Sequence, residues 1–313
     1  NSNFLNSIHI ELNFSLYFDG LSLLFSLLVS LIGVATNFYT HAYFKGEADE
    51  SNFLCWLNFF ILSMIILVLG GNFFTIFLGW ELIGLTSFFL INFWNKRRGV
   101  IKSSFKALAF NLVSDIFLLT AFVLFYDIYN TSNCSLFITL ICSSLPVDYY
   151  KLIFGFLCLL SCSAIKSVQI IGHLWLPDSM EAPVPASSLI HSATLVSAGI
   201  YLICRFQTLI LLLDISYIFI SIGSVTAAYG GIVAAAQTDM KKLLAYSTMS
   251  HCGFLWILSC SGNLWATILY LYLHGLFKAA TFYCSGVFIR NYGSQDTRLM
   301  GSGAKFFRLD SFF

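Results

Sequence analysis

Long apolar stretches, separated by short polar ones, recur along nearly the whole chain. Each has about 20 residues, the length that an α-helix needs to cross a hydrocarbon core of ~30 Å. The stretches lack the strict alternation of apolar and polar residues that a membrane β-barrel requires, so they predict helices. We predict nine membrane-spanning helices, at 18–43, 52–70, 72–93, 101–126, 151–171, 186–205, 209–236, 241–260 and 264–290. The segment 127–150 is expected to be a loop with room for a short amphipathic helix.

Composition agrees with a polytopic membrane protein. Of the 313 residues, 58% are hydrophobic and 10% are charged, whereas a soluble domain has roughly 25% charged residues. The mean hydropathy is +0.83, and the net charge of +1 gives no reason to expect a nucleic-acid partner. The nine cysteines are scattered without a CxxC pair. We interpret them as small buried hydrophobic residues and expect no metal site.

Lys and Arg residues divide unevenly between the two sides that nine spans define. One side has only Lys151 and Arg205. The other side has Lys45, Lys96, Arg97, Arg98, Lys102, Lys241, Lys242, Arg290, Arg298, Lys305 and Arg308. Positive residues gather on the cytoplasmic or matrix side. We therefore expect the C-terminus on this side and the N-terminus on the other side. The N-terminal residues do not show the pattern of a cleavable signal peptide.

Ionisable residues inside the predicted spans are the strongest functional signal. A charge near the bilayer centre costs about 2.5–3.5 kcal/mol on insertion scales. The set is Glu81, Lys106, Asp115, Lys166, His191, His251, His274 and Lys278. Any single member could be a packing polar group, and Lys106 and His251 lie near span ends, where snorkelling competes. Together the residues favour buried ion pairs or a chain of protonatable groups.

One stretch, KSVQIIGHLWLPDSMEAPVPASSLIHSATLV at 166–196, combines many of these features. Gly172, Pro177, Pro183 and Pro185 interrupt the helix that should continue past Lys166. A loop at the membrane surface is one interpretation. A helix broken at membrane depth is the other, and transporters use such breaks at ion sites.

A short internal repeat supports a transporter-like plan. FKALAF at 105–110 is echoed by FKAATF at 277–282, on spans four and nine. Spans five apart enter the membrane from opposite sides, which is the pattern of an inverted five-helix repeat. A counterpart of Lys166 in the second repeat would lie beyond residue 313, so we expect the second repeat to be incomplete here.

Several long motifs resemble one known family. They are FLGWELIGLTSFFLINFW (77–94), the stretch that begins at Lys166, QTDMKKLLAYSTMSHCGF (237–254), HGLFKAATFYCSG (274–286) and QDTRLMGS (295–302). Over residues 14–303 the chain resembles the subunit 5 family of the mitochondrial-type NADH–ubiquinone oxidoreductase (complex I). These are antiporter-like, proton-pumping subunits. The sequence departs from the family where Tyr270 replaces a common His, Ile171 a common Pro and Gly71 a common Asp.

The resemblance implies roles for six residues. Glu81 would pair with a lysine, and Asp115 would be the aspartate of span four. Lys166 would be the central switch of the first half-channel, and His191 would pass protons onward. His274 and Lys278 would form a bridge to the second half-channel.

The resemblance also implies an all-α, antiporter-like fold. We expect a lead-in at 1–17 on the intermembrane-space side and a first helix with its loop at 18–50. The first repeat would follow at 51–208, three helices of the second at 209–290, and a matrix-side tail at 291–313. The family usually has further helices at both ends. We expect a split gene, or another chain that supplies the missing helices.

The implied function is proton translocation in the mitochondrial inner membrane, coupled to NADH:ubiquinone oxidoreduction in partner subunits. We expect no cofactor on this chain, and partners among the membrane-arm subunits of complex I and lipids such as cardiolipin. The alternative is a subunit of a multisubunit sodium/proton antiporter, which shares these motifs. A structural fragment without pumping is the third interpretation, and the full set of six residues argues against it.

Overall fold

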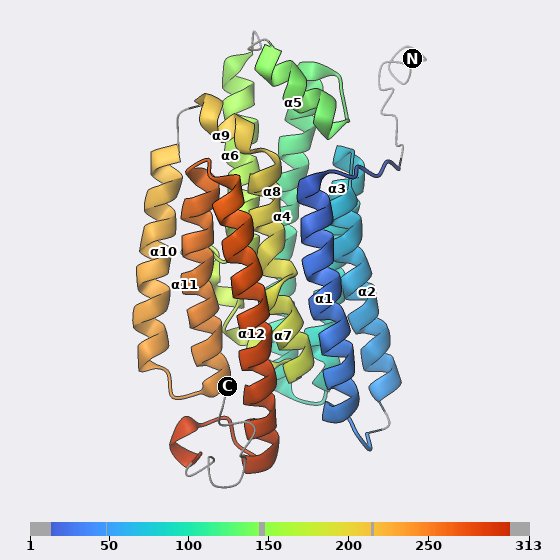
Figure 1. Cartoon of the computed structure of the whole chain (residues 1–313), viewed down its shortest axis with the longest axis vertical. Helices are drawn as coiled ribbons and strands as arrows, with labels where there is room; N and C mark the ends of the chain where they lie inside the picture. The colour runs from blue at the N-terminus through green and yellow to red at the C-terminus, as the bar shows by residue number, and fades with distance from the viewer. Residues whose placement is uncertain (1–13, 48, 144–147, 214–215, 301–313) are drawn as a thin grey trace.

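The computed structural model describes residues 14–47, 49–143, 148–213 and 216–300. Within these ranges the chain is a bundle of long helices that run roughly along one axis (Figure 1). The α-helices are α1 (Gly20–Tyr43), α2 (Glu50–Leu69), α3 (Phe73–Ile91), α4 (Arg98–Tyr129), α5 (Cys134–Ser143), α6 (Tyr149–Lys166), α7 (Val184–Ser192), α8 (Leu195–Arg205), α9 (Gln207–Leu213), α10 (Ser216–Ala236), α11 (Met240–Cys260) and α12 (Leu264–Tyr292). Short 3₁₀ turns are η1 (Asn92–Trp94), η2 (His173–Trp175), η3 (Asp178–Glu181) and η4 (Thr297–Leu299).

The all-helical membrane fold predicted from the sequence is confirmed. Among the described residues, eight segments are long and apolar enough to cross a membrane, with α7 and α8 forming one of them. Helix α12 has 29 residues but is not in this set. His274 and Lys278 lower its hydropathy, although it runs beside α11 over much of its length (Figure 1). The short helix expected in 127–150 is present as α5.

Three predicted spans differ from the structure. The fifth was expected to reach residue 171, but α6 ends at Lys166. The sixth, 186–205, is divided at Ala193 and Thr194 into α7 and α8. The seventh, 209–236, is divided into α9 and α10, on either side of two residues outside the described ranges. Hydropathy locates apolar segments but does not detect where backbone hydrogen bonds are redirected within them.

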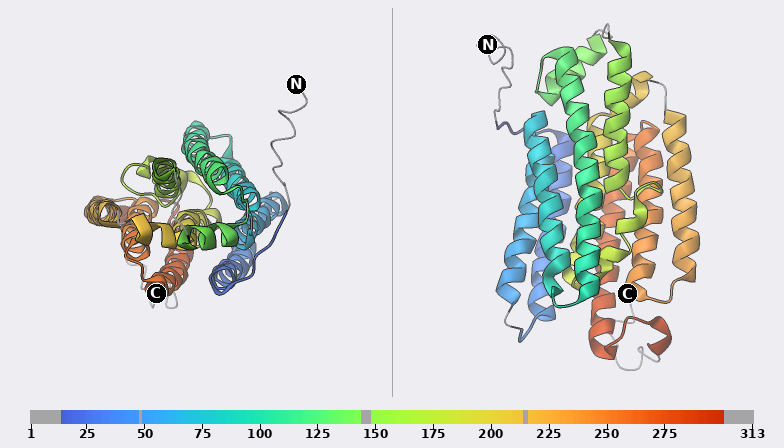
Figure 2. Two further views of the ribbon diagram at one scale, coloured as in Figure 1. Left: turned by 90° about the horizontal axis from the view of Figure 1, so that it is seen from above. Right: turned by 180° about the vertical axis from the view of Figure 1, so that it is seen from behind.

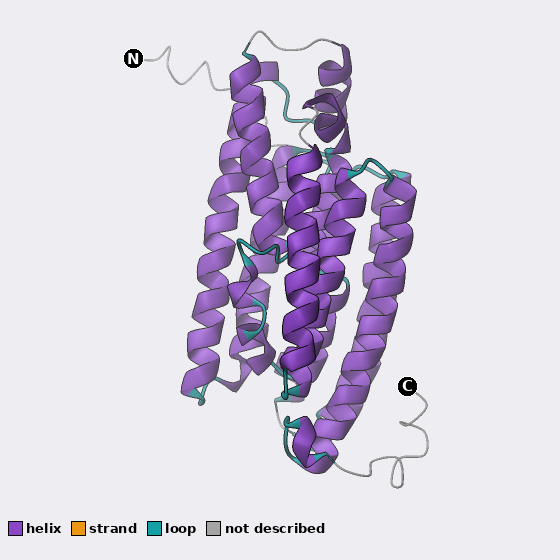
Figure 3. Ribbon diagram, turned by 90° about the vertical axis from the view of Figure 1, so that its left-hand side faces the viewer, coloured by secondary structure: helices purple, strands orange, loops and turns teal. Residues whose placement is uncertain are grey.

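Helices α7 and α8 form the centre of the bundle. Every residue of Val184–Arg205 is buried. Helix α7 packs against α1 and α12, and α8 packs against α6 and α11. The irregular segment 167–183 precedes this core, and non-helical backbone therefore lies part-way along the bundle as well as at its ends (Figures 2 and 3). The interrupted chain thus lies where protein, not lipid, surrounds it.

The outer surface is apolar. Phe38, Ile232 and Trp265 are each about three-quarters exposed, at 75%, 74% and 75%. Many other large hydrophobic side chains are exposed beside them. A soluble monomer would not present such a surface. It is the surface that a multi-pass membrane protein presents to lipid or to neighbouring membrane subunits.

The chain enters α1 through a short extended segment. Leu16 forms a bridge with Gly70, and the Tyr17 amide donates to the Leu69 carbonyl at 2.8 Å. Asp19 then caps α1 by accepting from the Ser22 amide at 2.8 Å. The expected lead-in at 1–17 is extended where it is described, and residues 1–13 lie outside the described ranges, as do residues 301–313 of the expected tail.

Candidate functional site

Helix α6 ends in a Schellman-type turn, in which the Val168 amide donates to the Ile165 carbonyl at 3.3 Å and the Gln169 amide donates to the Ala164 carbonyl at 2.9 Å. The Ser163 carbonyl accepts from the Ser167 hydroxyl at 2.7 Å in addition to its regular helical bond. Val168 then adopts φ of 58°, a conformation that is rare for a β-branched residue. Gly172, which we expected to relax the helix, lies after the break. Its role is close approach, since a Cβ there would be 2.8 Å from the Ile165 Cα.

Lys166 is the last residue of α6 and is buried, with 1% exposure. Its Nζ has no hydrogen-bond partner and lies 5.0 Å from the centre of the Trp80 ring. The charges of Asp115 and Glu81 both act on it, that of Asp115 more strongly. No direct ion pair joins Lys166 to either carboxylate in the described part of the chain. We call Glu81, Asp115 and Lys166 the Lys166 cluster.

The two acids come from different helices. Asp115 lies on α4, is 5% exposed and accepts from the Ser114 hydroxyl at 3.1 Å. Glu81 lies on α3 and is only half-buried. Three helices thus bring two acids and one base to the point where α6 is interrupted. A shift of any one helix would change the electrostatic balance on Lys166.

His191 is fully buried on α7 between two aromatic rings. Its ring is 6.5 Å from that of Trp175 and 5.9 Å from that of Phe282, centre to centre. The Ser179 hydroxyl donates to the Leu176 carbonyl at 2.5 Å, so its oxygen accepts from His191 Nε2, which lies 3.3 Å away. His191 Nδ1 has no partner. The neutral ring therefore carries its proton on Nε2 and offers Nδ1 as an acceptor.

A second group of polar residues lies between α11 and α12. Lys278 Nζ donates to the Ser247 hydroxyl at 2.6 Å. The His251 Nδ1 and the Tyr270 hydroxyl are 2.6 Å apart, and the rings of His251 and His274 are 5.4 Å apart, centre to centre. His274 Nε2 is buried without a partner. We call these five residues the Lys278 cluster.

The structure does not join the predicted residues into one continuous chain of hydrogen bonds. Phe282 lies one turn beyond Lys278 on α12 and packs against His191. The charge of Lys278 acts on His191, but no hydrogen bond is found between them among the described residues. Five of the six residues therefore fall into two clusters, and His191 hydrogen-bonds to neither of them among the described residues.

Two lysines that are not among the six residues with implied roles bond to the interrupted segment. Lys106 Nζ forms an ion pair with Asp178 at 2.6 Å, so this lysine bonds to protein and does not merely snorkel. Lys241, which we predicted at the start of the eighth span on the side rich in Lys and Arg, is 5% exposed. Its Nζ donates to the carbonyls of Ala182 and Met180 at 3.0 and 3.3 Å. No local sequence pattern indicates these contacts, because each joins residues at least 59 positions apart.

His251 was another incomplete prediction. Its place near a span end suggested snorkelling, but the structure places it beside His274 and Tyr270.

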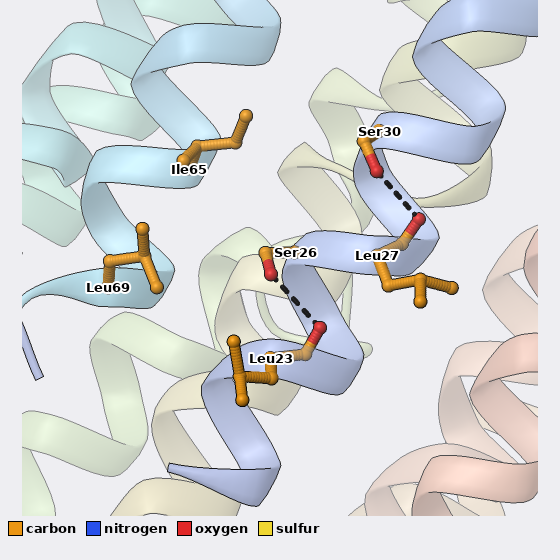
Figure 4. A pocket seen from close by; sticks show the side chains of 6 residues that line it. All are labelled: Leu23, Ser26, Leu27, Ser30, Ile65 and Leu69. Carbon is orange, nitrogen blue, oxygen red and sulfur yellow. Dashed lines mark hydrogen bonds between the residues drawn. The ribbon is translucent and has the colours of Figure 1, made fainter. Parts of the chain in front are cut away.

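The surface groove of about 490 Å³ between α1 and α2 has no charged lining residue (Figure 4). Its two serines donate to carbonyls of their own helix, from Ser26 to Leu23 and from Ser30 to Leu27. Buried ionisable groups such as Asp115, Lys166 and Lys278 lie elsewhere in the bundle.

Arg205, at the end of α8, forms a buried polar centre. Its guanidinium pairs with Asp19 at 2.5 Å and donates to the Tyr201 hydroxyl from two nitrogens, at 2.7 and 3.1 Å. The Tyr201 hydroxyl donates to the Val68 carbonyl at 2.6 Å. These contacts tie α8 to α1 and α2. Arg205 was predicted at the end of the sixth span, on the side with few positive residues, and the structure shows that it is 8% exposed.

Comparisons with known proteins agree with this architecture. Residues 70–309 match the family model described as NADH:quinone oxidoreductase/Mrp antiporter, transmembrane region, and residues 4–54 match that of the complex I chain 5 N-terminus. NADH-ubiquinone oxidoreductase chain 5 of Paramecium tetraurelia is 49% identical over 96% of this chain and 54% of its own. NADH-quinone oxidoreductase subunit L of Escherichia coli is 37% identical over 88% and 45%.

A solved structure is also similar. The Mrp complex from Dietzia contains a chain that superposes with a TM-score of 0.83 at 29% identity, over 94% of this chain and 33% of that one. The chain spans about half the length of the curated relatives it matches. The helical bundle with its interrupted helix, the buried acids and bases, and these matches lead to one conclusion: the chain belongs to the NADH:quinone oxidoreductase/Mrp antiporter family.

Proposed function

We propose that this chain moves protons as part of subunit 5 of a respiratory complex I, coupled to NADH oxidation and ubiquinone reduction in partner subunits. The observation that carries the proposal is Lys166, a buried amine without a hydrogen-bond partner at the end of an interrupted helix. Two carboxylates on neighbouring helices act on its charge. An ionisable group in this setting is expensive to keep and is therefore a functional candidate.

The proposed switch is electrostatic. Burial disfavours the charged form of Lys166, and the attraction of Asp115 and Glu81 favours it. A small movement of α3 or α4 would change that attraction and so move a proton on to or off Nζ. Lys166 Nζ forms no direct ion pair among the described residues, so such a movement would not have to break one.

His191 and the Lys278 cluster would continue the path. His191 Nδ1 has the free lone pair needed to accept a proton, while Nε2 is held by Ser179. Because Phe282 packs against the His191 ring, the step toward Lys278 would need water or a rotation of that side chain. Lys278 and His274 are both buried, so the cluster would hold no more than one added charge at a time.

We also propose a location, an orientation and partners. The excess of Lys and Arg near Lys45, Lys96 and Lys242 supports the matrix side for that end of the bundle in the mitochondrial inner membrane. The N-terminus would then face the intermembrane space and the C-terminus the matrix. Helices α10 to α12 would begin the second five-helix repeat, and further helices from another chain or a longer polypeptide would complete it. Other membrane-arm subunits and lipids such as cardiolipin would cover the apolar surface.

Substitution of Lys166 tests the function. Lys166→Ala should abolish or sharply reduce proton translocation per NADH oxidised, and Lys166→Arg should impair it because Arg does not release its proton. The matched control is Lys151→Ala, which removes an exposed lysine paired with Asp127 and Asp148. Normal proton stoichiometry in a fully assembled Lys166→Ala protein would contradict the proposal.

Purification separates the two family functions. If native protein purifies with flavin and iron–sulfur subunits, it works in complex I. If it purifies only with small antiporter subunits, it is a sodium/proton antiporter subunit. The higher identity to NADH dehydrogenase subunits than to the Mrp structure favours the first outcome.

A further inference from the structure

We propose that His251 is an additional proton-relay residue, which passes protons between His274 and the Tyr270 hydroxyl. This inference rests on the proposed function and extends it to a residue that none of the predicted roles includes. His251 comes from α11, whereas His274 and Tyr270 come from α12. A relay through it would therefore cross between two helices.

The geometry supports such a transfer. His251 Nδ1 lies 2.6 Å from the Tyr270 hydroxyl oxygen, which is within hydrogen-bond distance. On its other side, the His251 ring lies 5.4 Å from the His274 ring, centre to centre. No hydrogen bond joins the two rings among the described residues, so a transfer between them would use a bridging water or a rotation of one ring. His274 Nε2 is buried and makes no hydrogen bond among the described residues, so no fixed partner competes with His251 for it. His251 is the nearest imidazole found in the described part of the chain.

Solvent exposure increases from Lys278 and His274 to His251 and Tyr270. Lys278 and His274 are buried, at 1% and 4%, whereas His251 and Tyr270 are both partly exposed. The surrounding flank of α11 and α12 is apolar, with Phe254 and Leu273 at 47% and 60% exposure. A His–Tyr pair facing lipid alone would be costly. We infer that the pair meets water or a polar group of a neighbouring subunit, which makes it an outlet from the buried cluster.

The transfer balances without leaving charge behind. A protonated His274 would give its Nε2 proton to His251, which becomes the cation. His251 would then give its Nδ1 proton to the Tyr270 oxygen while the Tyr270 hydroxyl releases its own proton to the next acceptor. Tyr270 stays neutral throughout, which suits a phenol with an ordinary pKa near 10. Once the proton has left, a charge on Lys278 would disfavour its return to His274, because two like charges would then lie together in the buried cluster.

Four variants of the intact assembly test the inference in membrane vesicles. His251→Gln retains an amide that can bond to the Tyr270 hydroxyl but cannot carry a proton. Tyr270→Phe removes the hydroxyl and keeps the ring. His41→Gln is the matched control, because His41 is an exposed histidine that pairs with Glu50 far from the cluster. Lys166→Ala reports on the proposed function itself. Each is measured for assembly, proton translocation per NADH, and the ratio of rates in H₂O and D₂O.

We expect His251→Gln to assemble normally and to translocate protons about tenfold more slowly, with a larger solvent isotope effect than the wild type. The factor is below the full 10²–10⁴ for a direct proton-transfer group because water replaces part of the path. If His251→Gln does not assemble, Tyr270→Phe provides the same test, with slower translocation and a larger isotope effect expected.

Two outcomes overturn the inference. The first is wild-type translocation in His251→Gln or, where that variant does not assemble, in Tyr270→Phe, while Lys166→Ala is inactive. The second is slower translocation with an unchanged isotope effect, which would assign His251 a purely structural role. Normal translocation in Lys166→Ala would instead contradict the proposed function on which the inference rests.

Discussion

Gly199 lets α8 approach the end of α6, and this contact sets the position of Lys166. A Cβ added at Gly199 would be 2.5 Å from the Ser163 carbonyl oxygen and 3.0 Å from the Ser167 amide nitrogen. Carbon–oxygen contacts are normally no shorter than about 3.3 Å. Gly199→Ala therefore has to separate the two helices by roughly 0.8 Å, in the last turn of α6.

This separation of α6 and α8 has two expected effects, one on stability and one on proton translocation. Overpacking against rigid backbone costs about 1–3 kcal/mol, and the better helix propensity of Ala returns at most about 1 kcal/mol. Lys166 lies three residues after Ser163, so the same displacement moves its Nζ relative to Asp115. A misplacement of about 1 Å in a catalytic arrangement can reduce the rate roughly 10²-fold. We expect proton translocation by Gly199→Ala to fall between tenfold and 10²-fold.

The matched control is Gly231→Ala on α10. A Cβ there meets only the Ser250 hydroxyl at 3.7 Å, an ordinary contact, so this variant gains helix propensity without strain. Proton translocation per NADH and the thermal unfolding midpoint are measured for both variants in the assembled protein. If Gly199→Ala matches Gly231→Ala in both measurements, the close packing of α8 on α6 does not position Lys166, and the reasoning is wrong.

Three further predictions concern the rest of the bundle. Burial alone would raise the pKa of Asp19, but the Ser22 amide and a neighbouring guanidinium lower it on balance. Its stabilising effect should therefore be complete above pH ~3.9 and be lost as the pH falls through the folded value. The unfolding midpoint of Asp19→Asn should accordingly change less with acid than that of the wild type, and equal curves would contradict this. Lys106→Met should lower stability by about 0.2–1 kcal/mol, since both partners are partly exposed, and exchanging Lys106 with Asp178 should restore part of it; no recovery in the exchanged pair would argue against the ion pair. A membrane-impermeant maleimide should label Lys45→Cys only from the matrix side and the exposed native Cys142 only from the other side, and labelling of both from one side would refute the orientation.

Much of the fold was predictable because lipid constrains sequence strongly. A segment that crosses a bilayer must be apolar over about 20 residues, so the predicted spans coincide closely with α1 to α4 and α11. The end of α6 was less predictable. It depends on the positive φ of Val168, which directs the Val168 and Gln169 amides back to carbonyls of the last turn, and no residue-type preference indicates a valine in that conformation.

The burial of several candidate residues was predictable, but their pairing was not. Buried acids and bases are conspicuous in apolar segments, so Asp115, Lys166 and His191 were evident from sequence. Partners were not, because a partner depends on which helix faces which. Lys241 resembles an ordinary loop lysine until the fold brings it to the carbonyls of Met180 and Ala182.

The complete burial of Val184–Arg205 has a consequence for the biogenesis of the protein. The helices that enclose this segment are made at different times, since α1 and α6 leave the ribosome before it and α11 and α12 after it. For that interval, one flank of α7 and α8 must face lipid, translocase or a temporary chaperone. Where that flank faces lipid, His191 and the neighbouring serines would lie in hydrocarbon until α12 is inserted. The final docking of α11 and α12 is thus a late assembly step, separate from insertion, and a point at which quality control of the nascent chain can act.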